Sequence, residues 1–440
     1  MTPFVVKKRF IPRGKIKVPG DKAIAHRALL ISAVAGGITV IKNFPLHDDS
    51  KATLNALVAL GVKISPMSNQ ISVCGRGIHG LIKPRKPIFV NNSGTTLRLL
   101  LGLLAGQDFK TKLTAGKYLN LRPMSRVNIP LRLMGARIIA QNKGLQEYPP
   151  IIISGNKLKG ISYSLPVASA QVKSAILLAG LSAKGKTRVI EKVATRDHTE
   201  RMLKAYGADI TIRKNSIILN PGKNLVSPGE IYIPGDISSA AFFITLAAIA
   251  PGAKITICGV SLNPSRCGII HVLKRMRAKI KLEYTKKSKT KSKEPFGNII
   301  VNYSKLKGTV VNSLEIPSLI DELPVLMVAA SFAQGKTIFK AVGELRVKET
   351  DRINSNVTNL SRMGADIRVV KTGNREDIVI NGVCALYGAE LKSFGDHRTA
   401  MSMVVAAMVA QGQSRIDDIS CINKSFPGFI ATLKSLIKIR

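Results

Sequence analysis

The chain has few aromatic residues, few cysteines and no long apolar run. Aromatic residues make up 5% of the sequence and tryptophan is absent, so platforms for base stacking are not evident. The five cysteines are odd in number and widely spaced, with no C-x-x-C pair. This argues against a disulfide framework or structural zinc and favours free thiols in a reducing cytoplasm. With no run of 18 apolar residues and no signal-peptide pattern, we expect neither a membrane span nor secretion.

Acidic residues are scarce as well. The chain carries 67 Lys and Arg against 26 Asp and Glu, a net charge of +41. Such a charge attracts anions, whether nucleic acid, acidic membrane or phosphorylated metabolites. No zinc-finger, RNP-like or basic-zipper pattern accompanies it, so we expect no specific nucleic-acid partner. The one concentrated run, "KLEYTKKSKTKSKEP" at 281–295, has no apolar period and predicts a mobile hairpin loop, with a polyanion tether as the alternative.

A weak repeat runs through the 440 residues. Six segments share a pattern of amphipathic helix, small residue and strand, and they end at residues 64, 138, 210, 280, 367 and 439. In four of them a glycine follows the helix: Gly61, Gly135, Gly207 and Gly364. Glycine at that position predicts a left-handed helix cap, where a Cβ atom would be disfavoured.

A second similarity links 17–37 to 232–253. Both segments predict a strand, a Pro-Gly turn, an Asp at a helix start and a buried helix. Together with the repeat, this predicts an α/β protein of two domains with three repeats each. The first domain would comprise 1–20 and 236–440, and the second 21–235.

Polar groups recur at predicted helix starts in both halves. The segments are "GDKAIAHR" (20–27), "NNSGTTLR" (91–98), "RPMSR" (122–126), "PVASAQVKSA" (166–175), "ATRDHTE" (194–200), "IDELP" (320–324), "FGDHRTAM" (394–401) and "NKSFPGF" (423–429). Singly, each has a plain structural interpretation as a cap, a turn or surface charge. Together they predict an interdomain cleft for small molecules with several negative charges.

The stretch "GELRVKETDR" at 343–352 is dense in charge of both signs. On a helix, Glu344, Lys348 and Arg352 would stack at i, i+4 spacing, which usually marks a solvated face. The alternative is charge gathered for chemistry.

In this order the segments resemble the 3-phosphoshikimate 1-carboxyvinyltransferase, or EPSP synthase, family over roughly 14–430. The resemblance implies an inside-out α/β barrel of two domains, each with three βαβαββ units. It implies transfer of the enolpyruvyl group of phosphoenolpyruvate to the 5-hydroxyl of shikimate 3-phosphate, in the cytoplasm, by a monomer. No metal or organic cofactor is implied.

The resemblance also implies site residues. The catalytic set would be Lys22, Asp321, Glu349 and His397. Shikimate 3-phosphate would be bound by Lys22, Ala23, Arg27, Ser169, Ala170, Gln171, Thr195, Asp321 and Lys348. Phosphoenolpyruvate would be bound by Lys22, Asn92, Gly94, Arg122, Gln171, Arg352, Arg398 and Lys424. On this interpretation Lys348, Glu349 and Arg352 act in the site, while Arg346 and Asp351 orient them.

The sequence departs from the family pattern at a few positions. Ala23 and Ala25 stand where the family usually has Ser, Thr195 also replaces a usual Ser, and Asn91 replaces a usual Gly. A lost hydrogen bond to a charged group costs roughly 1.5–3 kcal/mol. A paralogue that binds anions or nucleic acid without turnover is therefore the alternative. The related UDP-N-acetylglucosamine carboxyvinyltransferase is a further one, which would need a reactive cysteine; Cys74 is the only cysteine of the 21–235 domain.

Overall fold

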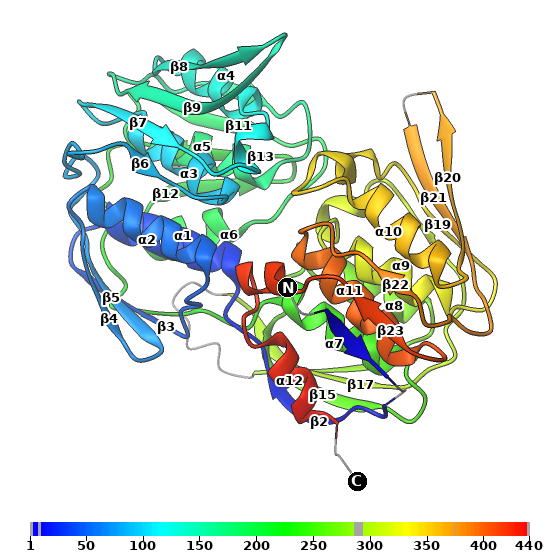
Figure 1. Cartoon of the computed structure of the whole chain (residues 1–440). Helices are drawn as coiled ribbons and strands as arrows, with labels where there is room; N and C mark the ends of the chain where they lie inside the picture. Colours follow the sequence, from blue (N-terminus) through cyan, green and yellow to red (C-terminus); the bar gives the residue numbers. More distant parts are fainter. Residues whose placement is uncertain (1–2, 8–9, 286–293, 374, 438–440) are drawn as a thin grey trace. The chain divides into compact units, whose positions relative to one another are not determined.

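The computed structural model describes residues 3–7, 10–285, 294–373 and 375–437 (Figure 1). The chain divides into two compact units. Unit 1 comprises Met1–Pro19, Gly235–Lys286 and Pro295–Arg440, and unit 2 comprises Gly20–Pro234 with Glu294 among the described residues. Within unit 2 the Asp21 N–H donates to the Pro234 carbonyl, and within unit 1 the Asp236 N–H donates to the Pro19 carbonyl. Both Pro-Gly turns are thereby fixed.

The elements follow one another as six repeats: the first five have the form β-α-β-α-β-β, and the sixth shows β-α-β-α among the described residues. The first repeat is β2 (Arg13–Lys17), α1 (Lys22–Ala33), β3 (Ile38–Lys42), α2 (Asp48–Ala59), β4 (Lys63–Met67) and β5 (Gln70–Cys74). The second is β6 (Ile88–Phe89), α3 (Gly94–Leu104), β7 (Lys110–Thr114), α4 (Ser125–Leu133), β8 (Arg137–Lys143) and β9 (Gln146–Ser154). The third is β10 (Ser162–Ser164), α5 (Ala170–Gly180), β11 (Thr187–Ile190), α6 (His198–Ala205), β12 (Asp209–Arg213) and β13 (Ser216–Asn220).

The remaining three repeats follow the same order. The fourth is β14 (Glu230–Tyr232), α7 (Ile237–Ile249), β15 (Lys254–Ser261), α8 (Gly268–Arg275), β16 (Lys279–Tyr284) and β17 (Phe296–Asn302). The fifth is β18 (Val310–Val311), α9 (Leu323–Ser331), β19 (Lys336–Phe339), α10 (Arg352–Arg362), β20 (Asp366–Thr372) and β21 (Arg375–Asn381). The sixth holds β22 (Glu390–Leu391), α11 (His397–Val409), β23 (Ser414–Ile416) and α12 (Phe429–Ser435). Its predicted last strand falls largely on 438–440, outside the described residues.

Each repeat builds one sheet, but two repeats exchange their first strands. In the second, third and fifth repeats the first strand pairs in parallel with the second, and the last two strands add antiparallel, as in β6-β7-β9-β8. β2, however, pairs in parallel with β15 of the fourth repeat, whereas β14 pairs in parallel with β3 of the first. β1 (Phe4–Val6) adds antiparallel to β23 in the sixth sheet. Each unit thus holds three sheets, and segments far apart in sequence close them.

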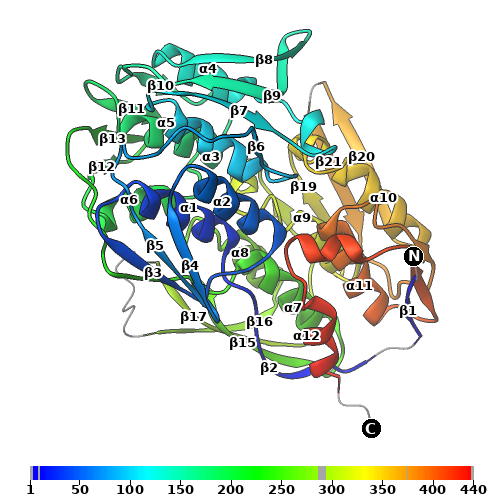
Figure 2. The same ribbon diagram turned by 60° about the vertical axis from the view of Figure 1, so that its left-hand side comes forward.

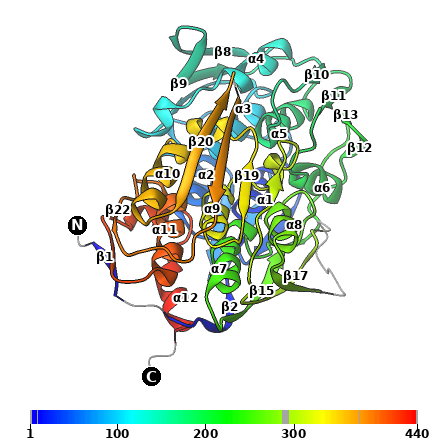
Figure 3. The same cartoon turned by 90° about the vertical axis from the view of Figure 1, so that its right-hand side faces the viewer.

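Helices fill the core of each unit and the sheets lie outside them. In unit 2, α3 packs against both α1 and α5 (Figure 2). α3 approaches α5 so closely that a Cβ atom on Gly102 would lie 2.3 Å from the Ala175 carbonyl oxygen. In unit 1, α7, α9 and α11 contact one another (Figure 3). Every residue of α7 is buried, which confirms the buried helix predicted within 232–253.

The helix boundaries match the predicted caps. Asp21 and Asp236 accept backbone N–H bonds at the starts of α1 and α7. Gly61, Gly135, Gly207 and Gly364 all have positive φ, between 83° and 108°. The left-handed caps are therefore confirmed, and with them the repeat.

Two predictions from the sequence need correction or limitation. Residues 343–352 do not form one helix: a 3-10 turn covers Gly343–Val347, and α10 begins only at Arg352. The predicted i, i+4 stacking of Glu344, Lys348 and Arg352 on one helix is therefore wrong. The hairpin of the Lys-rich segment is present, since β16 and β17 pair antiparallel, but its tip at 286–293 lies outside the described residues.

Candidate functional site

The N-terminal ends of several helices converge in unit 2. Lys22 opens α1 and contacts Asp49 in the first turn of α2. Thr53 of α2 bonds Thr96 of α3 at 2.6 Å, and Gln171 at the start of α5 donates to Thr95 at 2.8 Å. Helix N-termini present unpaired N–H groups and a positive dipole end. This part of unit 2 is thus suited to anions.

Lys22 is a partly exposed cation of this group. Its side chain is 23% exposed, and its ammonium forms an ion pair with the Asp49 carboxylate, which is 7% exposed. Two histidines lie close by. Burial lowers the pKa of His26 to about 3 and that of His47 to about 4, and the positive charge of Lys22 acts in the same direction. Both imidazoles are neutral at pH 7, so the positive charge here comes from Lys22 and its neighbours Arg27 and Lys51.

Arg27 lies one turn further along α1 and is almost fully buried. Its Nε donates to Thr199 Oγ1 at 2.6 Å, and a second nitrogen donates to Ser174 Oγ at 2.7 Å. A third donates to the Ala23 carbonyl at 2.8 Å. These bonds fix the plane of the guanidinium group, which is the geometry that a carboxylate needs for a two-point contact.

α3 begins with a glycine. A Cβ atom on Gly94 would lie 2.8 Å from a nitrogen of Arg98 and 2.9 Å from one of Arg122. Only glycine therefore leaves both guanidinium groups in place. Asn92 accepts backbone N–H bonds from Tyr118 and Leu119 at 3.1 and 3.2 Å, so its side-chain oxygen holds the loop that leads to Arg122. Asn91 has φ of 50°, a conformation that asparagine tolerates.

The start of α5 and the loop before α6 carry the predicted phosphate-binding hydroxyls. Ser169 caps α5 by accepting the Val172 N–H at 3.4 Å, and Ala170 is the first residue of that helix. Gln171 accepts a bond from Arg98 at 2.9 Å. The Thr195 hydroxyl donates to Glu191, so it would have to turn from that carboxylate to bind a phosphate.

A second group of predicted residues meets in unit 1, around Arg352. This side chain is 1% exposed, and its Nε donates to Asp396 Oδ2 at 2.8 Å. It also contacts Glu349, and it lies 3.5 Å from Asp321. Arg398 donates to the Asp321 carbonyl at 3.0 Å and lies 3.7 Å from its carboxylate. Three acids and two guanidinium groups thus form one ionic network.

Lys424 and His397 extend this network. The Lys424 ammonium lies 4.0 Å from Glu349 Oε1, and the His397 Nδ1 lies 4.0 Å from Asp396 Oδ1. Burial lowers the pKa of His397 to about 3. Lys348 lies in the segment between the 3-10 turn and α10, and it is half-buried.

The electrostatics around Arg352 follow from its burial. Burial acts to lower its pKa, but the charges of Asp396, Glu349 and Asp321 outweigh this and raise it. Burial also acts to raise the pKa of Asp396, but the charge of Arg352 outweighs it, and the pKa lies below the ordinary value. Both groups are charged at neutral pH. Arg346, which bonds Asp351 and Glu376, stands outside this network as a support for the cap of α10.

Several residues in these groups were not singled out from the sequence. Asp49 pairs with Lys22, Arg98 bonds Gln171, and Asp396 holds Arg352. Asp396 had a usable signal, because an acidic residue before "HRTAM" is a typical N-cap. Asp49 and Arg98 carried no such signal in the sequence, because their partners, Lys22 and Gln171, lie far away along the chain.

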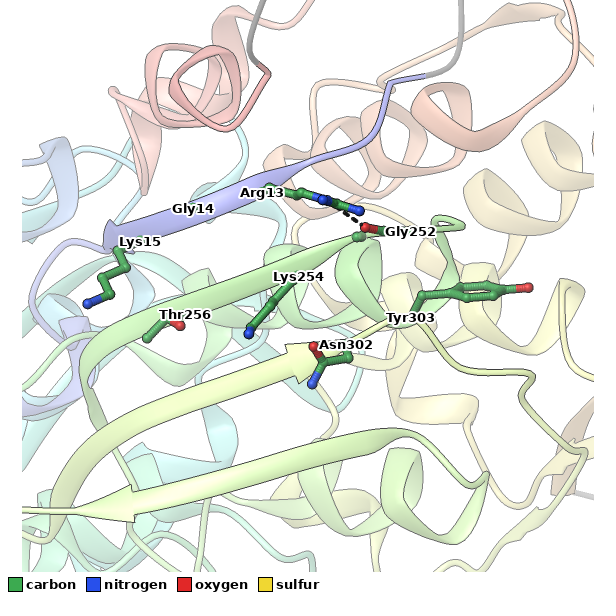
Figure 4. Close-up of a pocket in the computed structure, with 9 residues that line it drawn as sticks. Arg13, Gly14, Lys15, Gly252, Lys254, Thr256, Asn302 and Tyr303 are labelled. Carbon is green, nitrogen blue, oxygen red and sulfur yellow. Dashed lines mark hydrogen bonds between the residues drawn. The ribbon is translucent and has the colours of Figure 1, made fainter.

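Three further observations on the described residues concern metal sites, membrane spans and pockets. No group of three His, Cys, Asp or Glu among them has a geometry suited to a metal ion, and none of their helices is long and apolar enough to cross a membrane. A pocket of about 470 Å³ lies on the outer face of the β2–β15–β17 sheet, beside Arg13, Lys15 and Lys254 (Figure 4). None of the predicted site residues lines it.

Comparison with known proteins gives a consistent result. The model of the EPSP synthase (3-phosphoshikimate 1-carboxyvinyltransferase) family matches residues 10–433. A 3-phosphoshikimate 1-carboxyvinyltransferase of Syntrophomonas wolfei is 47% identical over 425 residues, which cover 96% of this chain and 97% of the relative. One from Citrifermentans bemidjiense is 45% identical over 438 residues, with full coverage of both chains.

Solved structures extend the likeness to the fold. An EPSP synthase from Acinetobacter baumannii superimposes with a TM-score of 0.86 at 40% identity, covering 99% of this chain and 98% of that one. The enolpyruvyl transferase NikO from Streptomyces tendae gives a TM-score of 0.76 at 14% identity over 99% of this chain and 97% of its own. At that identity the likeness concerns the fold alone.

Proposed function

Because the chain belongs to the EPSP synthase family, we propose that its reaction uses the two groups of residues described above, one in each unit. The reaction transfers the enolpyruvyl group of phosphoenolpyruvate to the 5-hydroxyl of shikimate 3-phosphate and releases phosphate. The relatives at 45–47% identity do not favour an anion-binding paralogue without turnover. The observation that supports the assignment of residues is the grouping of cations within each unit by itself: Lys22 and Arg27 on α1, with Arg122 beside Gly94, in unit 2, and Arg352 at the start of α10 in unit 1.

Charge explains why so many cations are needed. Each substrate carries one carboxylate and one phosphate worth about −1.5 to −2 at neutral pH. Joining the substrates therefore concentrates about five negative charges. Fixed guanidinium and ammonium groups offset that repulsion without having to reorganise when the reaction occurs. Arg27, held by three hydrogen bonds, would bind the shikimate carboxylate, and Ser169 and Thr195 would bind its phosphate.

The family resemblance assigns phosphoenolpyruvate contacts to residues of each unit. Arg122 beside Gly94 and Arg352 with Arg398 would contact its phosphate and carboxylate, because guanidinium groups bind such anions at two points. Arg352 already forms ion pairs with the carboxylates of Asp321, Glu349 and Asp396. It would therefore keep its position whether or not substrate is bound.

The chemistry is an addition followed by an elimination, and it needs a base and an acid. Asp321 would accept the proton of the 5-hydroxyl. Lys22 and Glu349 would deliver a proton to the enol methylene and remove one in the elimination. His397 is neutral at pH 7 because burial lowers its pKa to about 3, so it would act through hydrogen bonding rather than as a cationic acid.

The test is phosphate release from the purified protein with the two substrates, together and singly. We expect release only when both are present, and a loss of at least a hundredfold in Lys22→Met. Lys51→Met is the matched control, since Lys51 is exposed on the neighbouring helix α2, and it should retain activity. Release with phosphoenolpyruvate alone, or an active Lys22→Met variant, would contradict the proposal.

The proposal also covers the cellular compartment and the oligomeric state. The five cysteines are all unpaired, as expected of a protein in a reducing cytoplasm. We also expect a monomer. Size-exclusion chromatography with light scattering should give a mass near 47.4 kDa, whereas twice that mass would refute the monomer.

A further inference from the structure

A buried lysine joins two carboxylates behind the predicted phosphate-binding hydroxyls of unit 2. Lys173 lies in α5 and its side chain is 1% exposed. Its ammonium lies 3.0 Å from Glu191 Oε2 and 2.6 Å from Glu200 Oε1. Both carboxylates are buried as well. Because two buried carboxylates hold its ammonium, Lys173 is placed to act through neighbouring groups rather than on a substrate directly.

The three charged groups link the segments that carry the predicted shikimate 3-phosphate site. The Lys173 N–H donates to the Ser169 carbonyl at 3.1 Å, within the first turn of α5. Glu191 follows β11, and its other carboxylate oxygen accepts the Thr195 hydroxyl. Lys173 therefore ties the start of α5, with Ser169, to the loop that carries Thr195.

The next residues along both helices continue this link to Arg27. Ser174 Oγ bonds Thr199 Oγ1 at 2.6 Å, and both hydroxyls accept hydrogen bonds from Arg27. The pairs 173–200 and 174–199 thus connect α5 to α6 side by side. Movement of α5 relative to α6 would displace Arg27, Ser169 and Thr195 together.

A buried ion network is a poor means of stabilising a fold. Desolvation of the charges offsets much of their attraction, and apolar side chains of similar volume often do as well or better. Burial raises the pKa of Glu200, with Lys173 acting in the opposite direction. The network is therefore better explained by the fixed geometry that it imposes than by the stability it gives.

We infer that Lys173 is a positioning residue for shikimate 3-phosphate, acting through Arg27, Ser169 and Thr195. The inference rests on the proposed function of these three residues. It requires that loss of Lys173 weakens the binding of one substrate and leaves the other unaffected. A merely structural role would lower the active fraction, and hence the apparent kcat, without separating the two KM values.

The experiment measures both KM values in Lys173→Met. We expect the KM for shikimate 3-phosphate to rise by about 10- to 100-fold, the range that follows from a small misplacement of binding groups. The KM for phosphoenolpyruvate should stay within about twofold. Arg132→Met is the control, because Arg132 forms a 2.7 Å ion pair with Glu147 in the same unit, and both KM values should stay unchanged. Equal rises of both values in Lys173→Met, or no rise, would overturn the inference.

A second variant covers the case in which Lys173→Met does not fold. The triple variant Lys173→Met, Glu191→Gln, Glu200→Gln buries no charge but keeps an acceptor for Thr195. If the link itself matters, its KM for shikimate 3-phosphate stays high; recovery of the wild-type value would refute the positioning role. Wild-type protein without phosphate release would instead refute the proposed function, and calorimetric titration with shikimate 3-phosphate alone would still compare the variants.

Discussion

Arg277 occupies a position that suits glycine, and replacing it should stabilise unit 1. It follows α8 with φ of 70°, and it is exposed. Its N–H donates to the Lys274 carbonyl, and the Ala278 N–H donates to the Leu273 carbonyl. Gly364 and Ala365 make the same pair of bonds after α10. The fourth repeat therefore ends its helix as the fifth does, but with an arginine in the left-handed conformation.

The gain from Arg277→Gly can be estimated from the backbone. A left-handed residue other than glycine costs roughly 1–2 kcal/mol. Glycine returns about 0.5–1 kcal/mol of that through the greater freedom of the unfolded chain. The Arg277 side chain forms no hydrogen bond or ion pair within the described residues, so little else is lost. We expect a net gain of about 0.5–1 kcal/mol, or roughly 1–4 °C for a unit of this size.

The assay is calorimetric unfolding of the full chain, following the transition of unit 1. The reciprocal variant Gly364→Arg is the control. It should lower stability by about 1–2 kcal/mol or more, because a Cβ atom there would also lie 3.3 Å from Tyr387 Cδ2. If Gly364→Arg lowers the transition but Arg277→Gly leaves it unchanged or lowers it, backbone strain at Arg277 is refuted.

Three further predictions concern the site and its pH dependence. Arg352→Lys should raise the KM for phosphoenolpyruvate by roughly 10- to 100-fold, since one ammonium cannot replace bonds from three guanidinium nitrogens; steady-state rates test this, and an unchanged KM would contradict the role. Ala23→Ser should lower the KM for shikimate 3-phosphate by about tenfold if the missing hydroxyl matters, whereas an equal or higher KM would show that the site has adapted to alanine. His47 is neutral in the folded protein because its pKa is lowered to about 4, while the unfolded chain takes up a proton below about 6.5. Stability due to this residue should therefore fall as the pH drops from about 6.5 towards 4, by up to about 1.4 kcal/mol per pH unit; urea unfolding should show a shallower fall in His47→Asn, which keeps a capping side chain, and an equal fall would contradict the assignment.

Much of the fold could be predicted because its signals are local. An aspartate before a helix and a glycine after it mark boundaries by their own hydrogen bonding and φ preference, and the six repeats multiply that signal. The error at 343–352 had a local cause as well. The spacing of Glu344, Lys348 and Arg352 fits a helix, but Asp351 caps α10 by accepting the Ile353 and Asn354 N–H groups. A cap in the middle of a predicted helix is evidence against that helix.

The site was predictable only in part, because its partners come from distant segments. The resemblance to a family identified Lys22 and Arg352, but neither spacing nor composition indicated that Asp49 pairs with the first or that Asp396 holds the second. The buried trio of Lys173, Glu191 and Glu200 shows the same limit. A lysine in an apolar helix is visible in the sequence, whereas the carboxylates that neutralise it become visible only when α5 and α6 are packed.

The exchange of β2 and β14 between repeats has a consequence for synthesis on the ribosome. β2 leaves the ribosome early, yet its partner β15 begins only at Lys254, after all of residues 18–253. At 5–20 residues per second, β2 stays unpaired for roughly 10–50 s. All strands of the three unit 2 sheets, the last being β14, are made before β15. Three basic residues, Arg13, Lys15 and Lys17, occupy the exposed face of β2, and their mutual repulsion discourages pairing with another nascent strand during this delay.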